Sequence, residues 1–595
     1  MKKLEDILEN FDYSVDDKIL EEYSQDKSIF KIKPKAVVFP KNSEEIKKIV
    51  KLAKENNFSL TCRAAGTDMS GGPLTDSVLL VFTKYMNKIL EINPQEKYAI
   101  VQPGVYFRDL EKELDKYSLM FPSYPASKEI CAIGGMVAND SGGEKSLKYG
   151  KTHNYVIALK VVLSDGEEYN LESQTLTESP QTYLDNNNKQ TDLSWLQTNA
   201  NNVKMPIDSS DKNSSGQFSS NKDDRLDSIE SSQEFANFTQ NDIKQTDFYQ
   251  KTYQFLKSNY DVVQKTKPRV SKNSSGYNIW EAINGNNLDL IKLFVGSQGT
   301  LGIITEIKIK LVQKENFSQL IVVFVKDLKN LPSFTQDILN LQPTSLEITD
   351  DHTFKIFLRF AKEMASLLGA KGIFSMLKLF FPEILLFLKI GFPKLIILAE
   401  FTGNDKKEIT NKINQSKEIL KKFKYVYHEP KDALETEKYW RLRRDTYKLL
   451  REKIKNLTAA PFIDDFIILP QYLPEFLPRL YKILDEYRLV YTISGHLGDG
   501  NFHIIPLVNL KNNEQRKNIL EITDKVYDLV LQYNGILTAE HNDGLIRGPY
   551  LAKEYGEQIF NIFKEIKNIF DPLNIFNPYK KVMAIKDYIE KFMIN

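Results

Sequence analysis

The sequence predicts an α+β protein with more than one domain, on three observations. The chain has 595 residues, which is too long for a single hydrophobic core. Near its start, an apolar strand at 36–40, a helix capped at Ser43 and a strand at 58–63 form a β-α-β unit, which is typical of an α/β layer. After Leu311, predicted strands and helices alternate again. These observations predict at least two layered units.

The composition excludes several classes of protein. The formal net charge is +1, which gives no reason to expect nucleic acid as a partner. Two cysteines, Cys62 and Cys131, are too few for a disulfide framework or a cysteine-ligated iron–sulfur cluster, and they suit a reducing compartment. The N-terminus lacks an apolar segment, so we expect no signal peptide and a cytoplasmic location.

The remaining elements of the first part follow from local patterns. The first 35 residues are expected to be helical, polar and peripheral. The helix at Ser43 repeats its apolar residues at helical spacing and ends at an Asn-Asn pair. Further elements are expected in this order: strands at 78–81 and 99–105, a helix at 107–114, and a strand with a turn at 157–166.

Two stretches of small residues are candidates for ligand binding. The first, 63–73, directly follows a strand, so its backbone N–H groups can face a pyrophosphate. Its spacing matches neither common phosphate-binding fingerprint, and an ordinary glycine-rich turn remains an alternative. The second, 131–143, costs backbone entropy and packs little side-chain volume. It therefore indicates close approach of the backbone to a large flat ligand.

The clearest chemical signal lies at 495–503, which reads Gly-His-Leu-Gly-Asp-Gly-Asn-Phe-His, and at Glu540-His541. His496 and His503 would face opposite sides of a straight strand, but the glycines between them permit a turn that resets the geometry. Imidazole and carboxylate ligands suit Zn²⁺ or a similar divalent ion. We expect His496, His503 and Glu540 to hold the metal and His541 to act as a base beside it.

In their order along the chain, these motifs resemble the FAD-linked oxidase family, which has the vanillyl-alcohol-oxidase type of flavin fold. Three further stretches carry the resemblance: 272–277, 296–306 and 571–578. The spacing is similar to that of the D-lactate, glycolate and D-2-hydroxyglutarate dehydrogenases. The resemblance implies a two-subdomain FAD-binding domain and a ferredoxin-like α+β cap. The expected boundaries are 1–311 for the FAD-binding domain, 312–545 for the cap, and 546–595 for a segment that returns to the first domain.

The resemblance also implies how FAD is held. The expected cofactor-binding residues are Ala65, Gly66, Thr67, Asp68, Ser70, Gly71, Gly134, Gly135, Ala138, Asn139, Ser141, Gly142, Ile304 and Asn577. The flavin loop has no histidine for a covalent link, and Cys131 is expected to be a packed thiol. We therefore expect FAD to be bound without a covalent bond.

The activity implied is oxidation of a D-2-hydroxy acid, similar to lactate or glycolate, to the 2-keto acid. The hydride would pass to flavin N5, and His541 would take the proton of the substrate hydroxyl. The metal would lower the pKa of that hydroxyl, and Zn²⁺, Mn²⁺, Fe²⁺ and Co²⁺ all accept these ligands. Arg443 resembles the family's carboxylate-binding arginine, and a solvated basic helix face is the alternative.

Departures from the family concern the substrate pocket. No lysine matches the one that binds substrate in the hydroxyglutarate branch, since Asp464-Asp465 occupies its neighbourhood, and Tyr447 replaces a threonine. Two other functions remain alternatives: a non-catalytic flavoprotein subunit of an electron-transfer complex, and a metal-dependent hydrolase. Four electron acceptors remain alternatives: a quinone, a cytochrome, an electron-transfer flavoprotein and dioxygen.

Two segments stand apart from these motifs. Polar residues dominate 172–245, which cannot bury enough apolar surface to offset its ordering entropy, so we expect a disordered insert. The stretch 367–398 is apolar but has no clean run of 18 apolar residues, so no membrane span is expected. It is either a buried helix pair or, over 367–393, an amphipathic patch that touches a membrane or a redox partner.

Deletion of 172–245 is expected to leave the flavin content of the protein unchanged, because the insert contains none of the predicted binding residues. The ratio of flavin to protein absorbance of the purified variant measures this. Loss of flavin would contradict the prediction.

Overall fold

The computed structural model describes residues 3–175, 247–353, 355, 386–387, 391–444 and 457–594. Tyr447, nearly all of the segment 172–245 and most of the segment 367–398 lie outside these residues. The start of the expected insert is an exception, because β10 (Ser173–Thr175) pairs antiparallel with β12 (Asn287–Asp289). The expectation of disorder is therefore wrong for these residues: the pairing uses backbone groups, which composition does not reveal. No described helix is long and apolar enough to cross a membrane.

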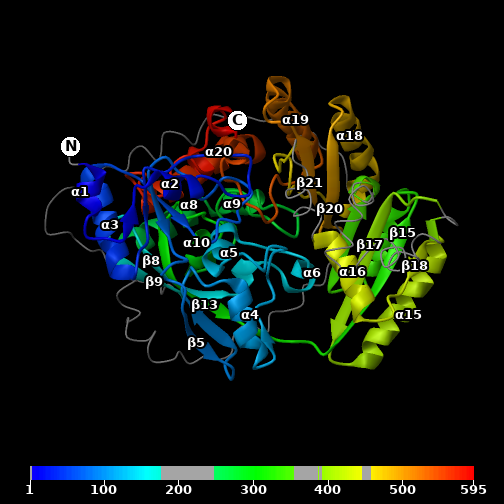
Figure 1. Ribbon diagram of the computed structural model, residues 1–595. Coiled ribbons are helices and arrows are strands. Elements are labelled where there is room, and N and C mark those ends of the chain that lie inside the picture. Colours follow the sequence, from blue (N-terminus) through cyan, green and yellow to red (C-terminus); the bar gives the residue numbers. More distant parts are fainter. Residues whose placement is uncertain are drawn as a thin grey trace.

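The first sheet belongs to the N-terminal part of the chain (Figure 1). Its strand order is β1-β2-β4-β3, with bounds Tyr13–Ser14, Ala36–Val38, Val78–Val81 and Leu60–Arg63. Strands β2, β4 and β3 run parallel, which requires a crossover between β2 and β3, and α3 (Ser43–Asn56) supplies it. The predicted β-α-β unit is thus confirmed.

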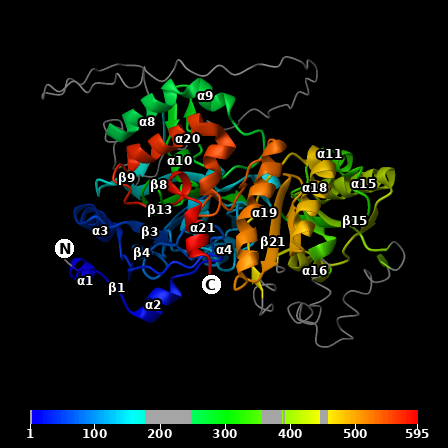
Figure 2. The same cartoon turned by 90° about the horizontal axis from the view of Figure 1, so that it is seen from above.

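The first 35 residues are less helical than expected. Only α1 (Leu4–Leu8) and α2 (Asp17–Glu22) are helices, and Ile29 and Phe30 are buried. The reason is a long-range contact: Lys31 N donates to Phe592 O (2.8 Å) and Ile594 N donates to Ile29 O (2.9 Å). The loop that contains Ile29 and Lys31 lies beside the C-terminal helix α21 (Asp587–Phe592), a pairing that local sequence does not reveal (Figure 2).

A second, antiparallel sheet completes the first domain. Its strand order is β5-β6-β13-β8-β9, with bounds Ile89–Asn93, Tyr98–Val101, Ile303–Lys310, Val156–Val162 and Glu168–Leu171. Helices whose apolar residues share its core are α4 (Phe107–Asp115), α5 (Ile133–Asn139), α8 (Asp247–Ser258), α9 (Tyr260–Lys265), α10 (Ile291–Phe294) and α20 (Leu551–Phe570). The core joins residues of 99–311 with residues of 551–582, because α20 packs on α8.

Short elements connect these layers. They are β7 (Leu119–Met120), which pairs with β14 (Val312–Gln313), β11 (Ile283–Asn284), which pairs with β12, and α6 (Ser146–Tyr149).

The cap is a seven-stranded sheet with the order β18-β15-β17-β16-β20-β21-β19. The bounds are Val426–His428, Phe317–Val325, Leu395–Gly403, Ser345–Asp350, Val490–His496, Asn501–Val508 and Thr458–Ala459. One face packs against α11 (Leu331–Leu339), α15 (Lys406–Phe423), α18 (Leu473–Glu486) and α19 (Asn513–Gln532). On the other face, α16 (Ala433–Arg444) covers β15 and β17, while β20 and β21 face the first domain.

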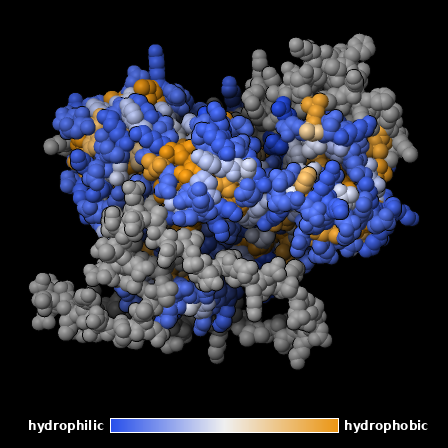
Figure 3. All heavy atoms as spheres, turned by 90° about the horizontal axis from the view of Figure 1, so that it is seen from below, coloured by the Kyte–Doolittle hydropathy of each residue, from blue (hydrophilic) through white to orange (hydrophobic). Residues whose placement is uncertain are grey.

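Exposed apolar side chains are scattered over separate elements. The most exposed are Leu434 (71%), Leu573 (54%) and Ile130 (48%). The face seen from below is mostly hydrophilic where the structure describes it (Figure 3). Scattered apolar residues of this kind are ordinary on a protein surface.

Candidate active site

A β-hairpin brings the two histidines of the 495–503 motif together. In the antiparallel register of β20 and β21, His496 faces Asn501 and Ser494 faces His503, so all four side chains lie on one face of the sheet. Glycine makes this geometry feasible: a Cβ on Gly495 would lie 2.2 Å from Asn501 O. The turn therefore resets the side-chain direction in the way the sequence predicted.

Glu540 is the centre of the cluster. Its Oε1 lies 3.0 Å from His496 Nε2 and 3.3 Å from His503 Nε2. Lys272, itself buried, reaches the other oxygen, Oε2, at 3.3 Å. The structure thus places the three predicted metal ligands in contact with one another.

Two further carboxylates hold the outer ring nitrogens of these histidines. Glu347 Oε1 lies 2.7 Å from His496 Nδ1, and Asp464 Oδ1 lies 3.2 Å from His503 Nδ1. Carboxylates in this position fix the ring and its tautomer, which leaves Nε2 of each histidine as the ligand atom. The donor set therefore fits a divalent metal.

His541 is anchored by Asp464 and its neighbour Asp465. Its Nδ1 lies 2.6 Å from Asp464 Oδ2, and its ring stacks on His503 with the centroids 4.8 Å apart. Asp465 Oδ2 accepts the backbone N–H groups of Glu540 (2.9 Å) and His541 (2.7 Å). Ligand atoms of Asp465, His503, Glu540 and His541 lie within 4.8 Å of one another. The backbone bonds to Asp465 make it a scaffold rather than a ligand.

Electrostatics explain how these charges remain in a buried site. Burial raises the pKa of Glu540, but Lys272 and His496 outweigh it and hold that pKa well below its usual range. Burial lowers the pKa of His541, but Asp465 and Asp464 outweigh this effect and raise the pKa to about 9. His541 is then protonated at neutral pH, a state in which it cannot accept a proton. A divalent cation on the neighbouring ligands would favour the neutral imidazole that a base requires.

Arg443 lies half-buried beside the cluster. Its side chain is 10% exposed and its Nε lies 3.0 Å from Glu347 Oε2, so Glu347 bridges Arg443 and His496. The alternative of a solvated helix face is therefore wrong for Arg443. The neighbouring Arg444 pairs with Glu144 of the first domain at 3.1 Å.

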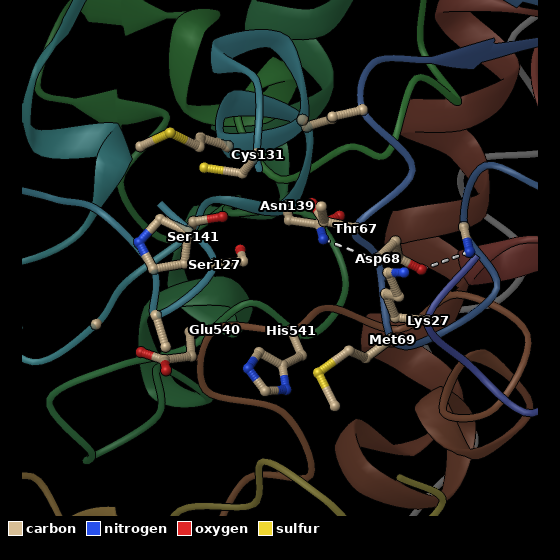
Figure 4. A pocket seen from close by; sticks show the side chains of 18 of the residues that line it. Lys27, Thr67, Asp68, Met69, Ser127, Cys131, Asn139, Ser141, Glu540 and His541 are labelled. Atoms are coloured by element: carbon tan, nitrogen blue, oxygen red, sulfur yellow. Dashed lines mark hydrogen bonds between the residues drawn. The ribbon is translucent and has the colours of Figure 1, made fainter. Parts of the chain in front are cut away.

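One cavity of about 730 Å³ joins this cluster to both small-residue stretches (Figure 4). Arg443 and His541 line it, as do the three predicted metal ligands. Predicted cofactor residues in its wall are Ala65, Gly66, Thr67, Asp68, Gly134, Gly135, Ala138, Asn139, Ser141, Gly142 and Ile304. The stretch 131–143 was expected as a loop, but α5 occupies its middle.

Three of the predicted cofactor residues do not line this cavity. Ser70 is buried and its hydroxyl donates to Asp68 Oδ2 (2.9 Å), while Gly71 packs against Phe30. Asn577 donates to Gly72 O (3.0 Å) and Gln298 O (2.7 Å) behind the wall. These three residues support the loop from behind the cavity wall.

The loop after β3 has the features of a diphosphate site. The backbone N–H groups from Gly66 to Met69 donate to no atom of the described chain. The Asp68 carboxylate holds the loop open, because it accepts N–H groups from Ser70 (2.9 Å), Gly72 (2.8 Å) and the Asn139 side chain (2.8 Å). Consecutive unpaired amides form an anion-binding concavity, which fits the diphosphate of FAD.

The sequence did not identify Glu347 as a residue of the site. It identified Asp464 and Asp465 only as the residues near which a substrate-binding lysine is missing. A signal was present: all three are charged residues inside apolar runs, in β16 and in 462–468. Buried carboxylates require partners, so such residues indicate a polar network.

Comparisons with known proteins agree with this geometry. Residues 314–581 match the family "FAD linked oxidases, C-terminal domain", and residues 34–172 match "FAD binding domain". A D-2-hydroxyglutarate dehydrogenase of Haemophilus influenzae is 26% identical over 93% of this chain and 48% of its own length. The chain thus spans about half the length of that relative.

Two other relatives match over nearly their full lengths. The glycolate oxidase subunit GlcD of Bacillus subtilis is 24% identical over 97% of this chain and 95% of its own. A D-lactate dehydrogenase of Anaerostipes hadrus is 25% identical over 95% and 94%, respectively.

Solved structures confirm the predicted fold. The 4-ethylphenol oxidase from Gulosibacter chungangensis has a TM-score of 0.62 at 15% identity and covers 98% of this chain and 97% of its own. p-Cresol methylhydroxylase has a TM-score of 0.62 at 14% identity, with coverages of 98% and 96%. At this identity, the likeness shows the fold alone.

Proposed function

We propose, from the premise that this chain belongs to the FAD-linked oxidase family, that it oxidises a small D-2-hydroxy acid to the 2-keto acid with FAD as the hydride acceptor. The observation that carries this proposal is one cavity bordered by the unpaired amides of Gly66–Met69, the His/Glu cluster and Arg443. Relatives named for D-lactate, glycolate and D-2-hydroxyglutarate support the substrate class. We favour a lactate- or glycolate-like acid, because Asp464-Asp465 occupies the neighbourhood in which the hydroxyglutarate branch has its substrate-binding lysine.

The residues of the cavity have separate tasks. Glu347 fixes the Arg443 guanidinium through Nε, so the terminal nitrogens of Arg443 are the donors for the substrate carboxylate. Asp464 holds His541 through Nδ1, so Nε2 of His541 is the atom that accepts the hydroxyl proton. His496, His503 and Glu540 would hold a divalent metal, whose Lewis acidity lowers the pKa of the substrate hydroxyl. FAD, when bound, supplies the two-electron acceptor.

The visible spectrum tests the whole proposal. The purified protein is expected to show flavin absorbance that D-lactate or glycolate bleaches under anaerobic conditions, with L-lactate as the matched control that does not. Absence of flavin absorbance would contradict the proposal. Flavin that no 2-hydroxy acid bleaches would instead favour the non-catalytic flavoprotein subunit. The alternative of a metal-dependent hydrolase does not explain the unpaired amides of Gly66–Met69.

Arg443→Met is expected to raise the KM for the 2-hydroxy acid by about 10- to 100-fold, because a charge-assisted bond to the carboxylate is lost. Arg441→Met is the matched control, since Arg441 lies on the same helix, is 42% exposed and pairs with Glu437. Steady-state turnover with an added artificial electron acceptor, which reoxidises the flavin, gives both KM values. Equal values for the two variants would remove Arg443 from its proposed role.

A further inference from the structure

The loop 24–32 folds back on itself, because Ile32 N donates to Ser24 O (2.9 Å), and it lies along the flavin loop. Lys27 N donates to Asp68 O (2.9 Å), and Arg63 Nη2 donates to Gln25 O (2.7 Å). Phe30 packs on Gly71, where an added Cβ would lie 2.8 Å from the ring. These contacts fix the segment against the loop from both sides. It precedes residue 34, where the match to the FAD binding domain begins.

The segment directs Lys27 into the cavity. Its neighbours, Asp26 (5% exposed) and Ser28 (3% exposed), are buried and joined, because Ser28 N donates to Asp26 Oδ1 (2.8 Å). Lys27 itself lines the cavity, and Figure 4 shows its side chain next to Asp68 and Met69. Lys27 is therefore held beside the unpaired amides from Gly66 to Met69.

The distribution of charge distinguishes Lys27 from the other cavity-lining cations. Among the described lining residues, lysine and arginine occur at three positions, Lys27, Arg443 and Arg444. The two arginines come from α16, which belongs to the cap. Of these three lining residues, Lys27 is the one that belongs to the first domain. An ammonium beside a row of free amides complements a dianion.

We propose that Lys27 is a cofactor-binding residue whose ammonium pairs with the diphosphate of FAD. The FAD-binding site then extends beyond the matched domain to include the N-terminal segment. The proposal concerns cofactor affinity alone, so it stands apart from the identity of the substrate.

Titration of the flavin-free full-length protein with FAD, followed by quenching of flavin fluorescence, tests this assignment. Lys27→Met is expected to raise the Kd for FAD by about 10-fold and to reduce its dependence on salt, because one charge-assisted contact is lost. Lys27→Arg is expected to keep most of the affinity. Lys33→Met is the matched control. Lys33 directly follows the segment 24–32, is exposed, and pairs with Asp17.

A competitor separates the diphosphate from the rest of the cofactor. ADP carries the diphosphate without the flavin, and its competition with FAD is expected to weaken in Lys27→Met, whereas that of adenosine is expected to stay unchanged. An unaltered Kd for FAD in Lys27→Met would overturn the proposal. A raised KM for the 2-hydroxy acid with an unaltered Kd for FAD would also overturn it, since Lys27 would then face the substrate. Failure of substrates to bleach bound flavin would contradict the proposed reaction and leave this assignment standing.

Discussion

His541→Ala is expected to retain FAD and to lose at least about 100-fold in the rate at which a D-2-hydroxy acid reduces it, which is the usual contribution of a positioned base. Asp464 holds the ring through Nδ1 at 2.6 Å, and His541 lines the cavity that contains the other cluster residues. Alanine removes the proton acceptor while the loop amides of Gly66–Met69 remain in place. Anaerobic stopped-flow absorbance of the flavin measures the rate.

A second histidine variant controls for a general loss of imidazole. His428 pairs with Glu435 at 2.9 Å and does not line the cavity, so His428→Ala is expected to reduce its flavin at the wild-type rate. Undiminished reduction in His541→Ala would show that another group takes the proton. Loss of flavin from His541→Ala would show instead that its role is structural.

The hairpin shows how much of the site was predictable. His496 and His503 were recognised because glycines at fixed places between them indicate a turn, and a turn is a local property of the sequence. Glu347 was not recognised, because it meets His496 from β16, which is 149 residues away along the chain. Carboxylates that hold the outer ring nitrogens are supplied by tertiary packing, so sequence reasoning finds them only as charges in apolar strands.

The stretch 131–143 illustrates the same limit for the fold. Its small residues predicted close approach to a ligand, and Gly135, Ala138 and Gly142 do line the cavity. Gly134 also approaches Pro103, since an added Cβ would lie 2.5 Å from its side chain. One property, small size, thus serves both backbone packing and the cavity wall. The helix α5 within this stretch was missed because glycines give a weak helical signal.

Glu540→Gln is expected to lose bound divalent metal and to reduce flavin at least about 100-fold more slowly, while it retains FAD. Glu540 Oε1 is the atom on which His496 Nε2 (3.0 Å) and His503 Nε2 (3.3 Å) converge. An amide of the same size keeps the packing but removes the negative charge that a dication requires. Elemental analysis of the purified variant gives its metal content, and its absorbance gives the flavin content.

Glu144→Gln is the matched control for this variant. Glu144 also lines the cavity, but it pairs with Arg444 at 3.1 Å and lies outside the histidine cluster. It is therefore expected to keep both metal and flavin. Treatment of the wild-type protein with a chelator should reproduce the loss of reduction, and re-addition of Zn²⁺, Mn²⁺, Fe²⁺ or Co²⁺ in turn should identify the metals that restore it. Full metal content with an unchanged rate in Glu540→Gln would contradict the role of Glu540 as a metal ligand. A metal that binds without the Glu540 carboxylate would have to take Asp465 and His541 as ligands instead.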